Sequence, residues 1–170
     1  MPTGALYQLA DMIALEPASN QRAEDFEFYL SSQPEVWETQ IAFLGNGHCV
    51  PLVQAATAVP VTTIWRKGPG VRGNYNIPRG TAIATFDAAG RYPNLETGNH
   101  AALFVELNLD GIVVVDQWRA KTPARPGRRL IRFRGGADSP SDDGDQFSVI
   151  VIPKRVSSED IRIAWLSLIS

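Results

Sequence analysis

One cysteine and two histidines are the residues of this chain best suited to nucleophilic chemistry. Cys49 is the only cysteine among the 170 residues. It follows Gly45-Asn46-Gly47-His48 and precedes Pro51, which a first helical turn tolerates because its missing N–H would be unpaired there. We therefore expect Cys49 at a helix N-terminus, where the helix dipole and free N–H groups favour a thiolate and can receive an oxyanion. The alternative is a lone buried cysteine that acts as a small hydrophobic residue.

A cysteine nucleophile needs a base, and the base must be His48 or His100. His48 adjoins Cys49, and neighbouring residues at a helix start point in different directions, so we expect His48 at the rim or in a loop. His100 opens the strand-like run His-Ala-Ala-Leu-Phe-Val-Glu-Leu. A histidine at the mouth of a strand is held rigidly and can face a cleft. The sequence therefore favours His100 as the base.

A third polar group must orient the imidazole ring. The segment Asp116-Gln117-Trp118 offers two candidates, one carboxylate and one amide. The parity of the preceding hairpin decides which of the two shares a sheet face with His100, since successive side chains of a strand point to opposite faces.

The hairpin between the two segments is predicted from its turn residues. Asn108–Gly111 is typical of a type I turn with glycine in the left-handed position, which gives a three-residue loop. That register pairs the asparagine with Ile112 and puts Asp116 on the face of His100, as a five-residue loop also would. A two- or four-residue loop would bring Gln117 onto that face instead. We prefer Asp116, with Gln117 as the fallback.

The elements that must position these residues follow from periodicity and turn signals. A helix is expected over Cys49–Ala58, ending before Pro60. Strands bounded by Gly, Pro, Asn and Asp turns are expected at Thr81–Phe86, Ala101–Leu107, Ile112–Trp118, Arg129–Arg134 and Phe147–Ile152. A helix followed by four or five antiparallel strands indicates an α+β fold.

Residues 1–43 differ from the remainder because they are rich in Ala, Leu, Glu and Gln. We expect helices around Gly4–Leu15 and Ala23–Leu30, and a third after Pro34. The sequence thus divides into a mostly helical N-terminal extension, residues 1–43, which packs on the domain, and a main domain, residues 44–170.

Charge and composition argue against several other classes. The net charge of −2 creates no basic field for nucleic acid. The first 21 residues lack the basic and apolar regions of a secretion signal, and no apolar run is long enough to span a membrane. His48 and Cys49 match no zinc-ligand spacing, and Asp138–Asp145 departs from EF-hand spacing, so we expect a turn there and neither a metal nor a cofactor.

Seven basic residues lie between Arg119 and Arg134 without an intervening acid. They are consistent with a surface that binds carboxylates or, less favourably, nucleic-acid phosphates. A solvated strand face is favoured, because four nearby aspartates offset the charge.

The stretch from His100 to Trp118 resembles the histidine hairpin of papain-like cysteine peptidases, in which a histidine is followed by a hairpin and then Asn-x-Trp. Asp116 stands where that pattern has asparagine. The resemblance implies that Trp118 shields the hydrogen bond between the histidine and its orienting partner.

A closer resemblance covers roughly residues 44–152 and leaves out about the first 40. Its segments occur in order: Gly45–Gln54, Gly80–Phe86, Gly90–Asn94, Gly98–Ala102 and Asp116–Trp118. They resemble the second class of type VI secretion amidase effectors, with their domesticated relatives, within the NlpC-like and CHAP-like cell-wall peptidases. The resemblance implies a papain-like α+β fold in which the cysteine-bearing helix packs on a four- to six-stranded antiparallel sheet.

The same resemblance implies an antibacterial cysteine peptidase that acts on peptidoglycan as an amidase and cuts the crosslink between diaminopimelate and D-alanine. Cys49, His100 and Asp116 would be its catalytic residues. Its partners would be peptidoglycan, a secretion apparatus and a cognate immunity protein. Injection into the periplasm of a target bacterium would explain the missing signal. A thiol acyltransferase or deamidase on another substrate, and a non-catalytic binding module, remain as alternatives.

Overall fold

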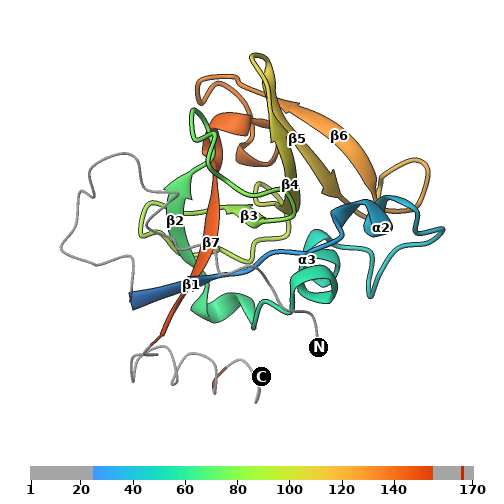
Figure 1. Cartoon of the computed structure of the whole chain (residues 1–170), viewed down its shortest axis with the longest axis horizontal. Helices are drawn as coiled ribbons and strands as arrows, with labels where there is room; N and C mark the ends of the chain where they lie inside the picture. Colours follow the sequence, from blue (N-terminus) through green and yellow to red (C-terminus); the bar gives the residue numbers. More distant parts are fainter. Residues whose placement is uncertain (1–24, 155–165, 167–170) are drawn as a thin grey trace.

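The computed structural model describes residues 25–154 and residue 166, and within this part of the chain seven strands form one sheet. The strand order is β1-β7-β3-β4-β5-β6, with β2 paired to β7 beside this path (Figure 1). All pairings are antiparallel. The strands are β1 (Phe26–Phe28), β2 (Arg66–Gly70), β3 (Ala82–Thr85), β4 (Ala101–Leu107), β5 (Gly111–Asp116), β6 (Gly127–Arg132) and β7 (Phe147–Pro153).

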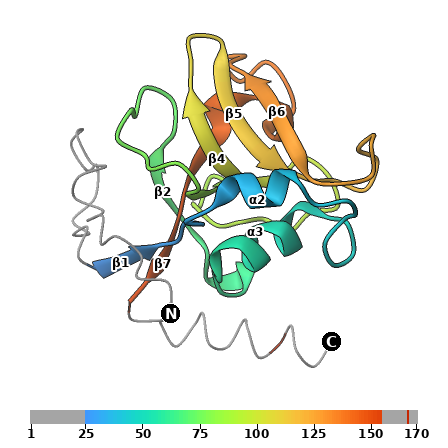
Figure 2. The same ribbon diagram turned by 45° about the vertical axis from the view of Figure 1, so that its right-hand side comes forward.

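Two short α-helices, α2 (Pro34–Glu38) and α3 (Cys49–Thr57), lie on the same side of the sheet, where α3 contacts β4 and α2 contacts β5 and β6 (Figure 2). Three single turns of 3₁₀-helix complete the described elements: η2 (Thr62–Ile64), η3 (Pro140–Asp142) and η4 (Gly144–Gln146). Among the described residues, no helix has the length and apolar character that a bilayer crossing requires.

Most of the predicted elements are present. The helix from Cys49 and the helix after Pro34 are confirmed, as are all five predicted strands, with ends that shift by no more than two residues. The sheet has one strand more than the upper limit we expected, because β1 and β2 also join it. The α+β class is confirmed.

The helix predicted around Ala23–Leu30 is wrong. Phe26–Phe28 is instead β1, which pairs with β7, and Leu30 bridges to Thr81 of the loop before β3. Phe26 and Phe28 are half-buried while Glu27 between them is exposed, which is the two-residue period of a strand. The helix predicted over residues 4–15 lies outside the described residues, and the division at residue 43 stays a prediction.

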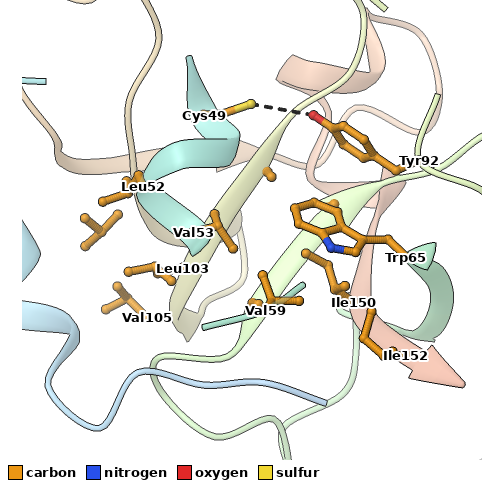
Figure 3. Packing of buried hydrophobic residues seen from close by; sticks show 14 of the residues in the cluster. Cys49, Leu52, Val53, Val59, Trp65, Tyr92, Leu103, Val105, Ile150 and Ile152 are labelled. Atoms are coloured by element: carbon orange, nitrogen blue, oxygen red, sulfur yellow. Dashed lines mark hydrogen bonds between the residues drawn. The ribbon is translucent and has the colours of Figure 1, made fainter. Parts of the chain in front are cut away.

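Both faces of the central strands are buried. On one face, Leu52 and Val53 of α3 are fully buried against Leu103 and Val105 of β4, with Trp65 beside them (Figure 3). Burying such an aliphatic side chain stabilises the fold by about 1.5–3 kcal/mol, so α3 is firmly fixed to the sheet. A second cluster covers the opposite face, with Ile83, Ala102, Phe104, Ile112, Val114, Ile131, Phe147 and Val149 among its members.

The turn of the β4–β5 hairpin differs from the predicted one. Leu107, rather than Asn108, pairs with Ile112. The Asn108 N–H donates to the carbonyl oxygen of Gly111 at 3.1 Å, and the Asn108 side chain accepts the Gly111 N–H at 3.0 Å. The predicted pairing is therefore wrong, and this turn by itself would place Gln117 on the face of His100.

A β-bulge in β4 reverses that outcome. Between the pairs Phe104–Val114 and Glu106–Val113, β4 has one extra residue, which shifts the alternation of its side chains by one. Beyond the bulge, Asp116 is again on the same face as His100. Asp116 thus occupies the predicted face for a different reason from the one the sequence suggested.

Gly80 contacts Ser31, which follows β1, and the backbones of the two residues approach closely. The φ of Gly80 is +91°, and an added Cβ would lie 2.1 Å from the Ser31 carbonyl oxygen. The Ser31 N–H donates to the Gly80 carbonyl oxygen at 2.9 Å. We expect Gly80→Ala to lower the free energy of unfolding by about 3 kcal/mol, through backbone strain and the loss of this hydrogen bond. Urea denaturation measures it.

Gly73→Ala is the matched control, because Gly73 also has a positive φ (+74°) but no heavy atom within 4 Å of an added Cβ. It should cost only about 1 kcal/mol, from the left-handed backbone. Equal losses for the two variants would contradict the close approach at Ser31.

Candidate active site

Cys49 is the first residue of α3, as the sequence predicts, and the loop before it sets its position. Gly45 and Gly47 in that loop have φ values of +55° and +82°. A Cβ on Gly45 would lie 2.8 Å from the Cβ of Pro51 in the first turn of α3. Glycine at these positions lets the chain turn sharply into the helix.

Gln117 holds this loop in place. Its fully buried amide accepts the Leu44 N–H at 3.0 Å and donates to the carbonyl oxygens of Leu44 at 2.9 Å and His48 at 2.7 Å. Gln117 therefore does not take the place of Asp116 beside His100. It positions the residues that lead into Cys49.

His100 is brought against Asp116. It lies directly before β4, and its side chain is buried. Its backbone N–H donates to Thr85 Oγ1 at 3.0 Å, and its carbonyl oxygen accepts the Thr85 N–H at 3.0 Å. The ring Nε2 lies 2.9 Å from Asp116 Oδ2. Hydrogen bonds thus fix both the backbone and the ring of His100.

Three groups surround the Cys49 sulfur. The Tyr92 hydroxyl lies 3.6 Å from the sulfur (Figure 3). The imidazole ring of His100 and the backbone N–H of Ala101 lie close enough to lower the pKa of Cys49. The side chain is only 8% exposed. The cysteine and histidine, 51 positions apart in sequence, therefore meet as predicted.

The pKa values of the two residues move in opposite directions. Burial acts to raise the pKa of the Cys49 thiol, but hydrogen bonding and charge from His100, with contributions from Tyr92 and Ala101, outweigh it and lower the pKa. Burial acts to lower the pKa of His100, yet hydrogen bonds to Asp116 and Cys49 and the charges of both raise it to about 9. Near neutral pH this combination favours a thiolate–imidazolium pair.

Two cations complete the surroundings of Asp116. Lys121 Nζ lies 2.7 Å from its Oδ1, and Arg129 Nε lies 2.6 Å from its Oδ2. Lys121 also donates to the carbonyl oxygens of Asp116 and Gly127, each at 2.9 Å. Burial acts to raise the pKa of Asp116, but His100, Arg129 and Lys121 hold it well below its usual range. The carboxylate is therefore ionised whenever the protein is folded near neutral pH.

The other cations of the predicted basic run are largely paired. Their ion pairs are Arg128–Glu38 at 2.8 Å, Arg132–Asp110 at 4.0 Å and Arg134–Asp138 at 3.2 Å, and Arg129 also pairs with Asp142 at 3.1 Å. The run is a partly solvated strand face, as favoured from the sequence. No local pattern indicated that two members of the run, Lys121 and Arg129, reach the buried carboxylate.

Trp118 and His48 lie at the edge of this arrangement. The Trp118 ring meets the His100 ring edge-on at 6.4 Å between centroids, and Lys121 and Arg129 lie over it at 4.9 and 4.8 Å. These contacts place Trp118 beside the His100–Asp116 hydrogen bond. The papain-like pattern implies that Trp118 shields this bond. His48 is exposed and is the N-cap residue of α3, in keeping with a rim position.

No cluster of three or more His, Cys, Asp or Glu side chains with metal-binding geometry occurs within the described part of the chain. The Asp138–Asp145 segment contains η3 and the start of η4, each a single 3₁₀ turn. Asp143 accepts the backbone N–H groups of Arg134 and Gly136, and Asp145 accepts those of Arg134 and Gly135.

Comparison with known proteins assigns the family. Residues 24–150 match the family model described as domesticated amidase effector 2. The chain belongs to this family. Residues 24–43, which we expected to lie outside the resemblance, fall within the match.

Individual relatives agree with this assignment. Over 91 residues the chain is 46% identical to a type VI secretion amidase effector 2 protein of Salmonella typhi, with 52% of this chain and 68% of that protein covered. It is 42% identical over 91 residues to a domesticated amidase effector 2 of Ixodes scapularis, and there it spans 51% of its own length and 56% of the relative's.

A solved structure, type 6 secretion amidase effector 2 (Tae2), aligns with a TM-score of 0.65 at 32% identity. The alignment covers 76% of this chain and 98% of that one. The papain-like α+β fold expected from the sequence is confirmed.

Sequence reasoning assigned no role to three residues of the site: Tyr92, Lys121 and Arg129. Tyr92 lay in a segment that carried the family resemblance, but nothing local marked its side chain as pointing to Cys49. The lysine and arginine were indistinguishable from surface cations, because the loop after β5 folds Lys121 back onto Asp116 and strand pairing brings Arg129 to it.

The ion cluster predicts a large stability effect for Asp116→Asn. The change leaves Lys121 and Arg129, whose side chains are 10% and 24% exposed, without their common anion. We expect the free energy of unfolding at pH 7 to fall by about 3 kcal/mol. Because the folded-state pKa of Asp116 is depressed, its contribution is present above about pH 4 and is lost as the pH falls further. Denaturant unfolding from pH 7 to pH 3 should show the two proteins converging.

Asp110→Asn is the control for this experiment. Asp110 is 71% exposed in its ion pair with Arg132, so the change should cost about 0.5 kcal/mol or less. If Asp116→Asn is as mild as this control, the buried ion cluster contributes little to the stability of the fold.

The thiolate–imidazolium pair predicts the alkylation behaviour of the single cysteine. Since the pKa of Cys49 is lowered, iodoacetamide should label wild-type protein well below the usual thiol pKa of about 8.5. His100→Gln removes the largest group that lowers this pKa, so labelling should move to higher pH. Mass spectrometry of the intact protein measures the rate. Superimposable pH profiles for the two proteins would show that His100 does not activate the sulfur.

Proposed function

We propose that this chain is a cysteine amidase that hydrolyses an amide bond in the peptide part of peptidoglycan, namely the crosslink between diaminopimelate and D-alanine. The observation that carries the proposal is the placement of one imidazole between a cysteine and a carboxylate. His100 Nε2 lies 2.9 Å from Asp116 Oδ2, and the same ring lowers the pKa of Cys49. The family assignment and the amidase names of the relatives support the same reaction.

In the proposed mechanism, the Cys49 thiolate attacks the carbon of the amide carbonyl and forms a C–S bond. The π electrons of the C=O bond move onto the carbonyl oxygen. Free N–H groups at the start of α3 receive this oxyanion. The His100 imidazolium gives its proton to the leaving amine, which produces an acyl-enzyme. His100 then takes a proton from water, and the hydroxide attacks the thioester to release the acid and the thiolate.

Asp116 holds the ring in the tautomer and orientation that these steps need. Its low pKa keeps it ionised while His100 cycles between its charged and neutral forms. Gln117 and the glycines before Cys49 fix the sulfur from the other side. The site is therefore positioned before a substrate arrives.

We further propose that the protein acts as an antibacterial secreted effector, delivered by a type VI apparatus to the periplasm of a target bacterium and countered by an immunity protein in the producer. The support is the name of the Salmonella relative, a type VI secretion amidase effector. Expression with a periplasmic leader should lyse a test bacterium, whereas cytoplasmic expression should not. Lysis by a leader-bearing Cys49→Ala variant would contradict enzymatic toxicity.

Digestion of purified sacculi tests the reaction itself. Wild-type protein should convert crosslinked muropeptides into uncrosslinked ones by opening the diaminopimelate–D-alanine bond, as read by liquid chromatography and mass spectrometry. Cys49→Ala should reduce the rate by at least about 1,000-fold, since it removes the nucleophile. Leu109→Ala, at the exposed tip of the β4–β5 hairpin, is the control and should digest at the wild-type rate.

The products also separate the rival thiol chemistries. A transferase would give new amide-linked products instead of free acid ends, and a deamidase would change the mass of a side-chain amide without opening a crosslink. Full activity in Cys49→Ala would end the proposal. If wild-type protein cleaves a different peptide bond, the proposed diaminopimelate–D-alanine bond is wrong.

A further inference from the structure

Tyr92 is the buried polar side chain at the sulfur to which the mechanism above gives no role. It follows β3 in a loop, is 6% exposed, and carries its hydroxyl 3.6 Å from Cys49 Sγ (Figure 3). Its ring packs against the fully buried ring of Trp65, with 5.1 Å between centroids and 58° between planes. Trp65 is itself held by a 2.9 Å hydrogen bond from Nε1 to the Pro60 carbonyl oxygen. The phenol is therefore aimed at the sulfur by rigid packing.

Asn99 determines which way the Tyr92 hydroxyl points. The Leu95 N–H donates to Asn99 Oδ1 at 2.6 Å, and this contact fixes the orientation of the amide. Asn99 Nδ2 then donates to the Tyr92 hydroxyl oxygen at 3.4 Å. Because the oxygen accepts from Asn99, the hydroxyl hydrogen is free to point at Cys49.

The phenol also keeps its hydrogen at any working pH. Burial, followed by the charge and hydrogen bond of Cys49, raises the pKa of Tyr92 far above its ordinary value. A neutral phenol beside a thiolate is a donor and does not compete with His100 for the negative charge.

We propose that Tyr92 is a further catalytic residue, whose hydroxyl donates a hydrogen bond to the Cys49 thiolate and keeps the sulfur ionised for attack, with Asn99 as its positioning residue. The inference rests on the proposed function, because it concerns the nucleophile of that reaction. No proton leaves Tyr92 in any step. The phenol acts with the Ala101 N–H as a neutral donor, while His100 supplies the charge and the transferable proton.

The pH dependence of Cys49 alkylation tests this role without any substrate. Tyr92→Phe retains the ring that packs on Trp65 and removes only the hydroxyl. We expect the midpoint of the iodoacetamide profile to move up by about one pH unit, and the rate well below the midpoint to fall about tenfold. Tyr75→Phe is the control, since Tyr75 is 75% exposed and its profile should match wild type.

A second variant tests the direction of the hydrogen bond. Asn99→Asp keeps an acceptor for the Leu95 N–H but replaces the donor to Tyr92 with a second acceptor, which draws the phenol hydrogen away from the sulfur. It should also raise the midpoint. In the Tyr92→Phe background the same change should have a smaller effect, because no phenol hydrogen remains to be redirected.

An unchanged alkylation profile in folded Tyr92→Phe would overturn the inference, and so would an equal effect of Asn99→Asp in both backgrounds. Sacculus digestion separates this result from the fate of the proposed function. If wild-type protein digests sacculi and the Tyr92→Phe profile is unchanged, the inference alone fails. If wild-type protein leaves sacculi intact and the profile still shifts, the sulfur–phenol contact stands and the proposed reaction fails.

Discussion

The buried carboxylate of Asp116 organises three segments of the chain. A fully buried aspartate is costly unless cations and hydrogen bonds compensate it, and here the compensation comes from His100 before β4, Lys121 after β5 and Arg129 on β6. The loss of any one partner would leave the charge less fully compensated. The need to compensate the buried Asp116 charge therefore fixes the part of the site that holds the His100 imidazole.

The residue that follows Asp116 orders the other side. Asp116 is the last residue of β5 and Gln117 follows it directly. Each makes contacts with a different part of the site: the carboxylate holds the His100 ring, and the amide holds the loop that leads to Cys49. Because successive residues of an extended chain point in opposite directions, one dipeptide reaches both. The separation of sulfur and imidazole is thus set by a rigid strand end and not by flexible loops.

The residue types of the site were predictable because thiol chemistry requires them, and the chain has few candidates. The register was less predictable. The β-bulge at Val105 has no glycine or other local signature, and Asp116 was correctly placed only because an unexpected turn and an unexpected bulge offset each other. The region of β1 was misread because Phe26, Tyr29 and Leu30 have helical spacing, whereas pairing with β7 decides the structure. Contacts that depend on strand pairing, such as those of Arg129, have no local pattern to reveal them.

The single cysteine has a chemical consequence of its own. A thiolate is the form of cysteine that peroxides attack, so the interactions that activate Cys49 also make it oxidisable. A sulfenic acid formed there would find no second cysteine within the 170 residues to convert it into an internal disulfide. Protection rests instead on the 8% exposure of the side chain beneath its aromatic and imidazole neighbours. Packing around Cys49, and not a second cysteine, therefore limits the oxidation of its reactive thiolate.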